Sequence, residues 1–269
     1  MYQQYELLKH PCYNNCSHAK YSRIHLPVAK RCNVQCNYCS RKFSKKGNVP
    51  GTCERIISPR EVESYLERII EKIPEETTTL GISGPGEPLF NKETFETLKI
   101  VREKYPNLYR CVATNGLLLE DVIDKLLECD VTHVTVTLNT IYPKTASKIY
   151  SWVNYGKIYY GLEAGEVIVE KQINGIIEAS KAGLLIKINT VYIPGINDRE
   201  VVDVAKVVSN YAYIMNIMPL IPNGKFSNLR MPTVEEIENA RNAASRYIRQ
   251  FYHCKLCRAD AYGVPGKLF

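Results

Sequence analysis

Six strand-like segments, each followed by a stretch of helical periodicity, dominate the pattern of this chain. They lie at residues 23–29, 78–83, 108–114, 131–138, 184–193 and 211–218. Strands that alternate with helices form parallel sheets whose faces the helices cover. The alternation therefore predicts an α/β protein whose sheet either closes toward a barrel or opens into a doubly wound layer. Both arrangements bind ligands at the carboxyl ends of the strands.

Two helices have clear start signals, whereas the ends of the chain lack periodicity. The segment from Ser58 to Glu61 combines a capping box with a proline at the first helical position, and Thr233 to Glu236 repeats the box. These signals predict helices over 59–72 and 233–249. We expect one domain of 1–269, with a core of about 20–225 and extensions at 1–19 and 226–269.

Ten cysteines in 269 residues are more than packing requires. The first nine residues carry no secretory signal, so we expect a reducing cytoplasm, where disulfides are rare. No apolar run reaches the roughly 18 residues of a membrane span. The net charge of +7 comes without basic stretches interleaved with aromatic residues, which argues against a nucleic-acid partner. Metal binding is the leading explanation for the cysteines.

Cys32, Cys36 and Cys39 form a C-x3-C-x2-C triplet in the loop after the first predicted strand. A structural zinc site takes four protein ligands, whereas an iron–sulfur cubane held by three cysteines keeps one iron open for chemistry. The absence of a fourth ligand nearby favours the cluster. Spacing alone still leaves a zinc site open.

Polar and glycine-rich turns follow two of the later strands. Gly84, Gly86 and Glu87 follow the second strand, and Thr137 and Asn139 end the fourth. Bare backbone beside a carboxylate suits the charged groups of an amino acid, and short polar side chains suit a ribose hydroxyl. Ordinary turn chemistry would use the same residues.

In order and spacing, the triplet and the glycine–glutamate turn resemble the radical S-adenosylmethionine (SAM) superfamily. The resemblance implies a partial (β/α)6 barrel with cysteine-bearing extensions at both ends. It also implies that one electron from the cluster cleaves SAM to methionine and a 5'-deoxyadenosyl radical. The residues implied are Cys32, Cys36 and Cys39 for a catalytic 4Fe-4S cluster, Gly84, Gly86 and Glu87 for the methionine group, Thr137 and Asn139 for the ribose, and Tyr38 and Ile193 for the adenine.

Further segments resemble the NifB family of nitrogenase cofactor maturases, from about His10 to Gly263. They are His10-Pro11-Cys12 and residues 23–29, 193–198, 218–222 and 254–261. The resemblance implies an enzyme that methylates and fuses two auxiliary 4Fe-4S clusters into the eight-iron precursor of the nitrogenase cofactor, around a carbide derived from SAM. It also implies separate proteins that donate clusters and electrons. We expect a separate carrier or scaffold for the product, since no carrier domain follows Phe269.

The same resemblance implies ligands for the auxiliary clusters. One cluster would be held by Cys12, Cys254 and Cys257. The other would be held by His25 and Cys111, with a cysteine that the family places six residues after the triplet. This chain has Lys45 there, and our hypothesis is that Cys53 takes its place.

Simpler readings exist for several of these residues. His25 lies beside Leu26 on a predicted strand. A lone histidine in such a position is often a core residue whose ring nitrogens are hydrogen-bonded within the protein. Cys111 fits a small buried apolar position equally well. The Cys254-x-x-Cys257 pair alone is typical of zinc or a redox dithiol as well.

Two other functions remain open from sequence. Lys45 in place of a ligand is the best support for a different radical SAM enzyme with auxiliary clusters, acting on an organic or peptide substrate. A non-catalytic carrier of iron–sulfur clusters would bind SAM poorly, and the glycine–glutamate turn argues against it. Cys16 and Cys129 receive no ligand role, and we expect Cys129 to serve packing.

Overall fold

The computed structural model describes residues 9–40, 50–74 and 76–267. Its main sheet has seven strands in the order β10-β1-β3-β4-β5-β8-β9. All neighbouring pairs are parallel except β10 with β1. The strands are β1 (Ser22–His25), β3 (Thr77–Ile82), β4 (Tyr109–Thr114), β5 (Val131–Thr137), β8 (Leu185–Tyr192), β9 (Ile214–Pro219) and β10 (Tyr262–Gly263). The six parallel strands confirm the predicted partial (β/α)6 barrel.

The first and last parallel strands are shorter than predicted. β1 ends at His25 rather than at residue 29, because Pro27 lacks the N–H that a central strand needs. β9 begins at Ile214 rather than at 211, because the N–H groups of Tyr211 and Ala212 both donate to the carbonyl of Val208 and close the preceding helix.

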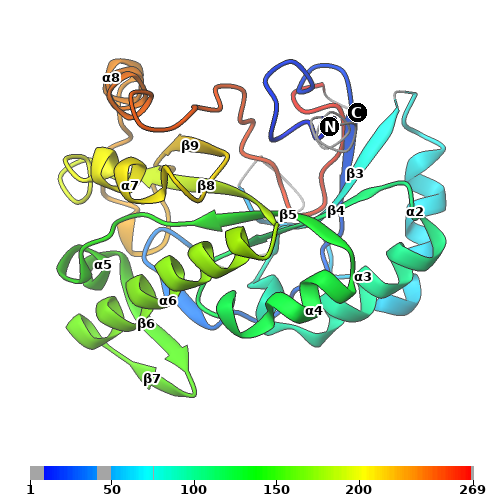
Figure 1. Ribbon diagram of the computed structural model, residues 1–269, viewed down its shortest axis with the longest axis horizontal. Helices are drawn as coiled ribbons and strands as arrows, with labels where there is room; N and C mark the ends of the chain where they lie inside the picture. Colours follow the sequence, from blue (N-terminus) through cyan, green and yellow to red (C-terminus); the bar gives the residue numbers. More distant parts are fainter. Residues whose placement is uncertain (1–8, 41–49, 75, 268–269) are drawn as a thin grey trace.

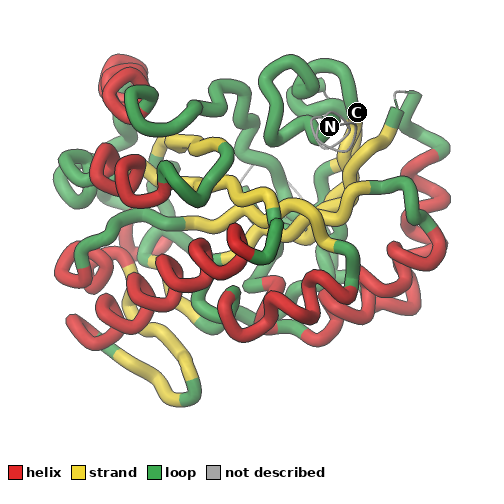
Figure 2. Tube along the Cα trace, viewed as in Figure 1, coloured by secondary structure: helices red, strands yellow, loops and turns green. Residues whose placement is uncertain are grey.

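Helices cover one face of the sheet, whereas loop segments from the chain ends lie over the other (Figures 1 and 2). The longest helices are α2 (Val62–Ile70), α3 (Lys92–Lys104), α6 (Gly161–Lys181), α7 (Val201–Val208) and α8 (Val234–Ala244), and α4 (Ile123–Glu128) is shorter. In β5, Val134 and Val136 belong to the main apolar core, while Thr135 and Thr137 line a cavity on the opposite face. The alternation of side chains along a strand thus separates the core from the cavity.

Both predicted helix starts are present. The Glu61 carboxylate accepts hydrogen bonds from the N–H and the hydroxyl of Ser58, each at 2.8 Å, and α2 follows a short turn over Pro59–Glu61. At α8, Thr233 and Glu236 bond reciprocally at 2.8 and 3.1 Å. α8 ends at Ala244 rather than at 249, since the following chain bonds to Met215 of β9 instead.

A second sheet has no counterpart among the predicted elements. It contains β2 (Val34–Cys36), β6 (Tyr150–Tyr155) and β7 (Lys157–Tyr159) in the order β2-β6-β7, and α5 (Pro143–Ile149) precedes it. Its strands are short, and β2 lies within the triplet loop, so the sequence offers little periodicity to reveal it. The pairing of Cys36 with Tyr150 anchors that loop.

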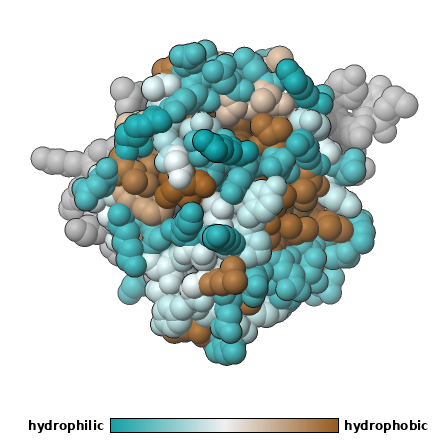
Figure 3. All heavy atoms as spheres, turned by 90° about the vertical axis from the view of Figure 1, so that its left-hand side faces the viewer, coloured by the Kyte–Doolittle hydropathy of each residue, from teal (hydrophilic) through white to brown (hydrophobic). Residues whose placement is uncertain are grey.

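Exposed apolar side chains occur on the side of the molecule that carries this second sheet. Figure 3 shows apolar patches set among hydrophilic atoms there. Ile158 and Leu162 are 51% and 55% exposed. In the described part of the chain, no helix has both the length and the apolar character needed to cross a membrane.

The N-terminal extension and the last part of the C-terminal extension lie side by side at the cavity face (Figure 1). β10 pairs with β1, and the Asn15 side chain donates to the carbonyl of Gln250 at 3.3 Å. Tyr13 and Phe251, each 1% exposed, pack together with Ile214 in a small apolar cluster. This packing carries cysteines from both ends of the chain to the same place.

Candidate functional site

A cavity of about 330 Å³ opens at the carboxyl ends of the parallel strands. Seven cysteines from four parts of the chain line it, together with two histidines. The cysteines are Cys12, Cys32, Cys36, Cys39, Cys111, Cys254 and Cys257, and the histidines are His10 and His25. Thiolates and imidazoles are the donors that iron–sulfur clusters and zinc prefer.

The arrangement of these donors favours clusters over single ions. Within the described residues, no three Cys, His, Asp or Glu side chains converge closely enough to hold one metal ion, as a zinc site requires. Each ligand of a cubane binds a different iron, so the ligands surround a volume rather than a point. Cysteines spread around one cavity therefore fit 4Fe-4S clusters.

Hydrogen bonds from the backbone and from the Gln35 side chain hold the triplet loop in shape. The Gln35 amide donates to the carbonyls of Cys36 and Cys39, both at 2.9 Å, and the N–H of Cys39 donates to the carbonyl of Cys36 at 3.1 Å. The N–H of Asn37 donates to Ile149 at the end of α5. The second sheet and α5 thus hold the part of the loop that carries Cys36 and Cys39.

Cys12, Cys254 and Cys257 lie together although they come from opposite ends of the chain. The pKa of the Cys12 thiol is raised to about 11, chiefly by burial and also by the neighbouring Cys257 and Cys254, while the charges of Lys187 and Arg23 oppose the shift. The Arg23 guanidinium donates to the Cys257 sulfur at 3.0 Å. The three thiols are therefore electrostatic neighbours in one buried site.

His25 and Cys111 lie on either side of Gly81, in register on three adjacent strands. A Cβ atom at Gly81 would come within 2.8 Å of the Cys111 sulfur and 3.2 Å of the His25 ring. The glycine therefore leaves a space that both side chains face. Burial, followed by the charge of Arg23, lowers the pKa of His25 to about 4, so its ring is neutral. Its Nδ1 donates to the carbonyl of Arg258 at 3.0 Å, so in the neutral ring Nε2 carries the lone pair that a metal ion could accept.

The other cysteines lie outside this cavity. Cys53 is fully buried and does not line it, and burial together with Asp260 raises its pKa to about 11. Cys129 packs in the main core, where we expected it, and Cys16 is exposed. Lys45 lies outside the described residues.

Glu87 lines the cavity with a carboxylate that is already partly engaged. It accepts hydrogen bonds from the Thr114 hydroxyl at 2.6 Å and from the N–H groups of Asn115 and Leu89 at 2.7 and 3.0 Å. Burial raises the pKa of Glu87 to about 7, and these bonds oppose the shift. A carboxylate offers about four acceptor positions, so one is left for a ligand ammonium.

Gly86 of this turn lines the cavity, and close packing or backbone conformation also favours glycine at both positions. A Cβ at Gly86 would clash with the carbonyl of Arg31, and its N–H donates to Ala29 at 2.6 Å. Gly84 has a φ of +138°, a conformation that favours glycine, and does not line the cavity. The turn is therefore docked against the segment that leads into the triplet.

Tyr38 and Thr137 line the cavity as predicted, but Asn139 and Ile193 do not. The Asn139 amide donates to the hydroxyls of Tyr38 and Tyr150 at 3.0 and 3.1 Å, and its oxygen accepts from the N–H of Val191 at 2.9 Å. Asn139 thus positions Tyr38 instead of facing a ligand. Ile193 is fully buried in the apolar cluster behind it.

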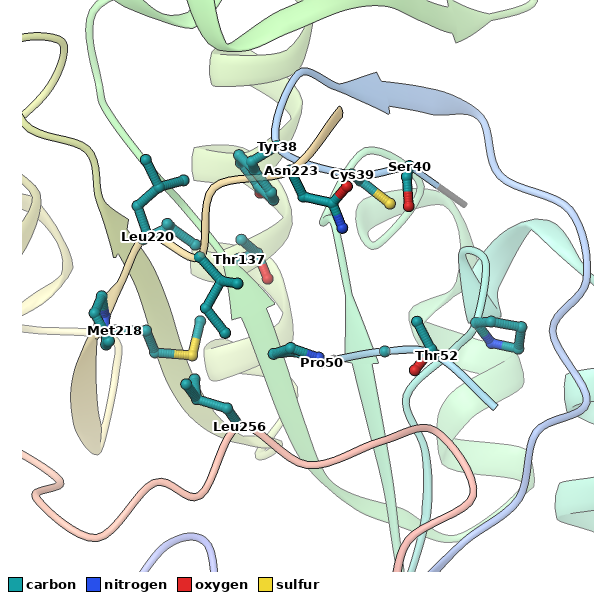
Figure 4. Close-up of a pocket in the computed structure, with 15 residues that line it drawn as sticks. Tyr38, Cys39, Ser40, Pro50, Thr52, Thr137, Met218, Leu220, Asn223 and Leu256 are labelled. Atoms are coloured by element: carbon teal, nitrogen blue, oxygen red, sulfur yellow. The ribbon is translucent and has the colours of Figure 1, made fainter. Parts of the chain in front are cut away.

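An adjoining, largely apolar chamber of about 210 Å³ shares Tyr38, Cys39 and Thr137 with the main cavity. Figure 4 shows Met218 and Leu220 on one side, Pro50 and Thr52 on another, and Leu256 from the C-terminal extension below. We did not predict these lining residues. The signals were the segments 218–222 and 254–261, in which the sequence gave Met218, Leu220 and Leu256 no role.

Comparison with known proteins identifies the class of enzyme to which this chain belongs. The radical SAM superfamily matches residues 26–208, more than half of the chain. The fold resembles a crystal structure of Streptococcus suis SuiB bound to S-adenosylmethionine, with a TM-score of 0.64 and 12% identity over 88% of this chain and 52% of that one. It also resembles HydG, a maturase of the FeFe-hydrogenase, with a TM-score of 0.62 and 14% identity over 93% of this chain and 54% of that one. The chain is a radical SAM enzyme.

Curated relatives define the family more narrowly. A FeMo cofactor biosynthesis protein NifB of Methanocaldococcus infernus is 50% identical over 96% of this chain and 86% of its own length. The protein of the same name from Methanocaldococcus jannaschii is 49% identical, with 95% and 86% covered. That of Klebsiella pneumoniae is 40% identical over 96% of this chain and 57% of its own length. The chain belongs to the NifB family.

Proposed function

We propose that this chain acts in the biosynthesis of the FeMo cofactor of nitrogenase, as a radical SAM enzyme that converts two 4Fe-4S clusters into a carbide-containing eight-iron precursor. The observation that carries the proposal is the single cavity in which seven cysteines meet Glu87 and His25. Four of these cysteines and His25 lie outside the triplet, so the cavity offers more soft ligands than one resident cluster uses.

Cys32, Cys36 and Cys39 would hold the resident 4Fe-4S cluster. When bound, that cluster supplies the electron that cleaves the sulfonium of SAM. Glu87 would accept a hydrogen bond from the methionine ammonium through its remaining acceptor position. Tyr38 and Thr137 would enclose the nucleoside.

The apolar chamber extends this proposal for SAM. Val191, Met218 and Leu220 offer an apolar wall suited to an adenine ring, in place of the Ile193 side chain, which lies behind the cavity. Asn139 would act indirectly, by holding the Tyr38 ring.

The substrate clusters would bind at two places on the cavity wall. Cys12, Cys254 and Cys257 would hold one of them. His25 and Cys111 would hold the other, and we retain Cys53 only as a hypothesis for completing that set. The methyl group of a first SAM would pass to a bridging sulfide of the cluster at Cys12, because the cavity aligns the two reactants. A second SAM, cleaved at the triplet, would supply the radical that removes hydrogen from this methyl group.

Partner proteins complete the proposal. Iron–sulfur clusters and electrons would come from donor proteins, and a carrier or scaffold would accept the product.

The test is to reconstitute the protein anaerobically, reduce it with dithionite and add SAM. Both 5'-deoxyadenosine and S-adenosylhomocysteine should form, and Lys206→Met, at an exposed ion pair on α7, is a control that should give both. If only 5'-deoxyadenosine forms, the methyl-transfer step is wrong. About twelve iron atoms per chain would agree with three clusters, and about eight would favour a radical SAM enzyme with an organic substrate.

A further inference from the structure

Two buried cations adjoin the Cys12, Cys254 and Cys257 site without a carboxylate partner. Lys187 of β8 is 3% exposed and Arg23 of β1 is 4% exposed. Neither side chain takes part in any ion pair recorded among residues 9–40, 50–74 and 76–267. Burying a charge without an opposite charge is costly, so a fold that retains two of them needs an anion at this place.

The contacts of both side chains lead to the proposed cluster ligands. The Lys187 ammonium donates to the carbonyl of Cys12 at 2.7 Å and lies 4.0 Å from the centroid of the Phe251 ring. The Arg23 guanidinium donates to the Cys257 sulfur at 3.0 Å and to the carbonyl of Gly263. Its Nε atom is buried, with no hydrogen-bond partner in the described structure.

Iron–sulfur clusters are the anions that fit this position. Thiolate ligands give such a cluster a net negative charge, and reduction adds another electron. Nearby positive charge and N–H···S hydrogen bonds stabilise the more negative, reduced state.

We propose that Arg23 and Lys187 form a cationic clamp that binds the substrate cluster of Cys12, Cys254 and Cys257 as an anion and raises its reduction potential. The clamp rests on the proposed function, because it presupposes a cluster on these cysteines. Lys187 supplies charge from β8, and Arg23 supplies charge and a directed hydrogen bond from β1. Both are positioning residues that act through the cluster.

The test uses a chain in which Cys32, Cys36, Cys39 and Cys111 are replaced by alanine, so that the cluster at the chain ends gives the only signal. Redox titration followed by electron paramagnetic resonance compares this background with the same background carrying Lys187→Met, Lys187→Arg or Arg23→Gln. Lys206→Met, on the exposed face of α7, is the matched control.

We expect Lys187→Met and Arg23→Gln each to lower the ratio of reduced to oxidised cluster about tenfold at a fixed potential, or about 59 mV for one electron. Loss of the cluster from these two variants, with retention in Lys187→Arg, supports the clamp equally. Lys187→Arg and Lys206→Met should titrate like the background. Unchanged potentials in Lys187→Met and Arg23→Gln overturn the clamp while leaving the cluster site intact.

Thermal unfolding separates the clamp from a purely structural role. In the cluster-free chain Lys187→Met should leave the unfolding temperature unchanged or higher, because an unpaired buried charge is removed. In the loaded chain the same change should lower it. A decrease in both forms would mean that Lys187 is structural. If the chain with the four alanine replacements binds no iron, this result contradicts the proposed cluster site and not the clamp.

Discussion

The two cysteine groups of the cavity are built in opposite ways. Cys32, Cys36 and Cys39 belong to one short loop, so their spacing is set within that loop, although pairing with β6 holds the loop in place. Cys12, Cys254 and Cys257 come from the two ends of the chain and meet only because both extensions pack on the sheet. A contiguous site depends on local geometry, whereas a site built from distant segments depends on the stability of the fold. A mutation in one cysteine group should therefore abolish cluster binding at that group and leave cluster binding at the other group intact.

Replacing Cys36 with alanine should have the largest effect. Cleavage of SAM should stop, because the resident cluster loses one of its three ligands, while iron bound at the chain ends remains. Product formation and iron content measure the two outcomes. Equal loss of all iron would contradict the independence of the two groups.

Replacing Cys12 or Cys254 with alanine should produce the reverse pattern. We expect the loss of about four iron atoms per chain and of S-adenosylhomocysteine formation, with 5'-deoxyadenosine still produced. Cys16→Ala is the matched control, since Cys16 is exposed and lies outside the cavity. Full iron content in Cys12→Ala would remove this cysteine from the ligand set.

Asn139→Ala tests the support behind the triplet loop. The change leaves the hydroxyls of Tyr38 and Tyr150 and the N–H of Val191 without their partner, so the free energy of unfolding should fall by about 2–4 kcal/mol. Thr137→Val, which keeps the shape of a cavity-lining residue, should lower SAM affinity with a smaller effect on stability. A large loss of SAM affinity in Asn139→Ala without loss of stability would instead indicate direct contact with the ligand.

Glu87 should make stability depend on pH. Its pKa is raised to about 7 from an ordinary 4.5, so between these values the folded chain holds a proton that the unfolded chain has released. The contribution is present below pH 4.5 and is lost as the pH rises through 7, by at most about 3 kcal/mol. Denaturant unfolding at pH 5 and pH 8 should show a smaller difference for Glu87→Gln than for the wild type. Identical differences would mean that Glu87 is ionised throughout.

Cys53→Ala should have the smallest effect. The Cys53 thiol is fully buried outside the cavity lining, so we expect unchanged iron content and only the modest destabilisation of a lost sulfur contact. The loss of about four iron atoms would instead establish Cys53 as the ligand that replaces the cysteine missing at Lys45.

The sequence was sufficient where the signal is local. Strand and helix periodicity predicted the parallel sheet, and the capping boxes predicted the starts of two helices. Each of these depends on residues a few positions apart, whose geometry the backbone itself constrains.

Only the tertiary structure decided which polar residues face the cavity. Asn139 and Thr137 are two residues apart, and the sequence predicted the same role for both. In the structure the Asn139 side chain is hydrogen-bonded within the protein, whereas Thr137 lines the cavity. Gly86 lines the cavity, and only the structure shows that the Arg31 carbonyl beside it leaves no room for a side chain. Lys187 gave no sequence signal, because its role depends on Cys12, which packing alone brings to it. A spacing rule describes neighbours along the chain, whereas burial and charge pairing depend on neighbours in space.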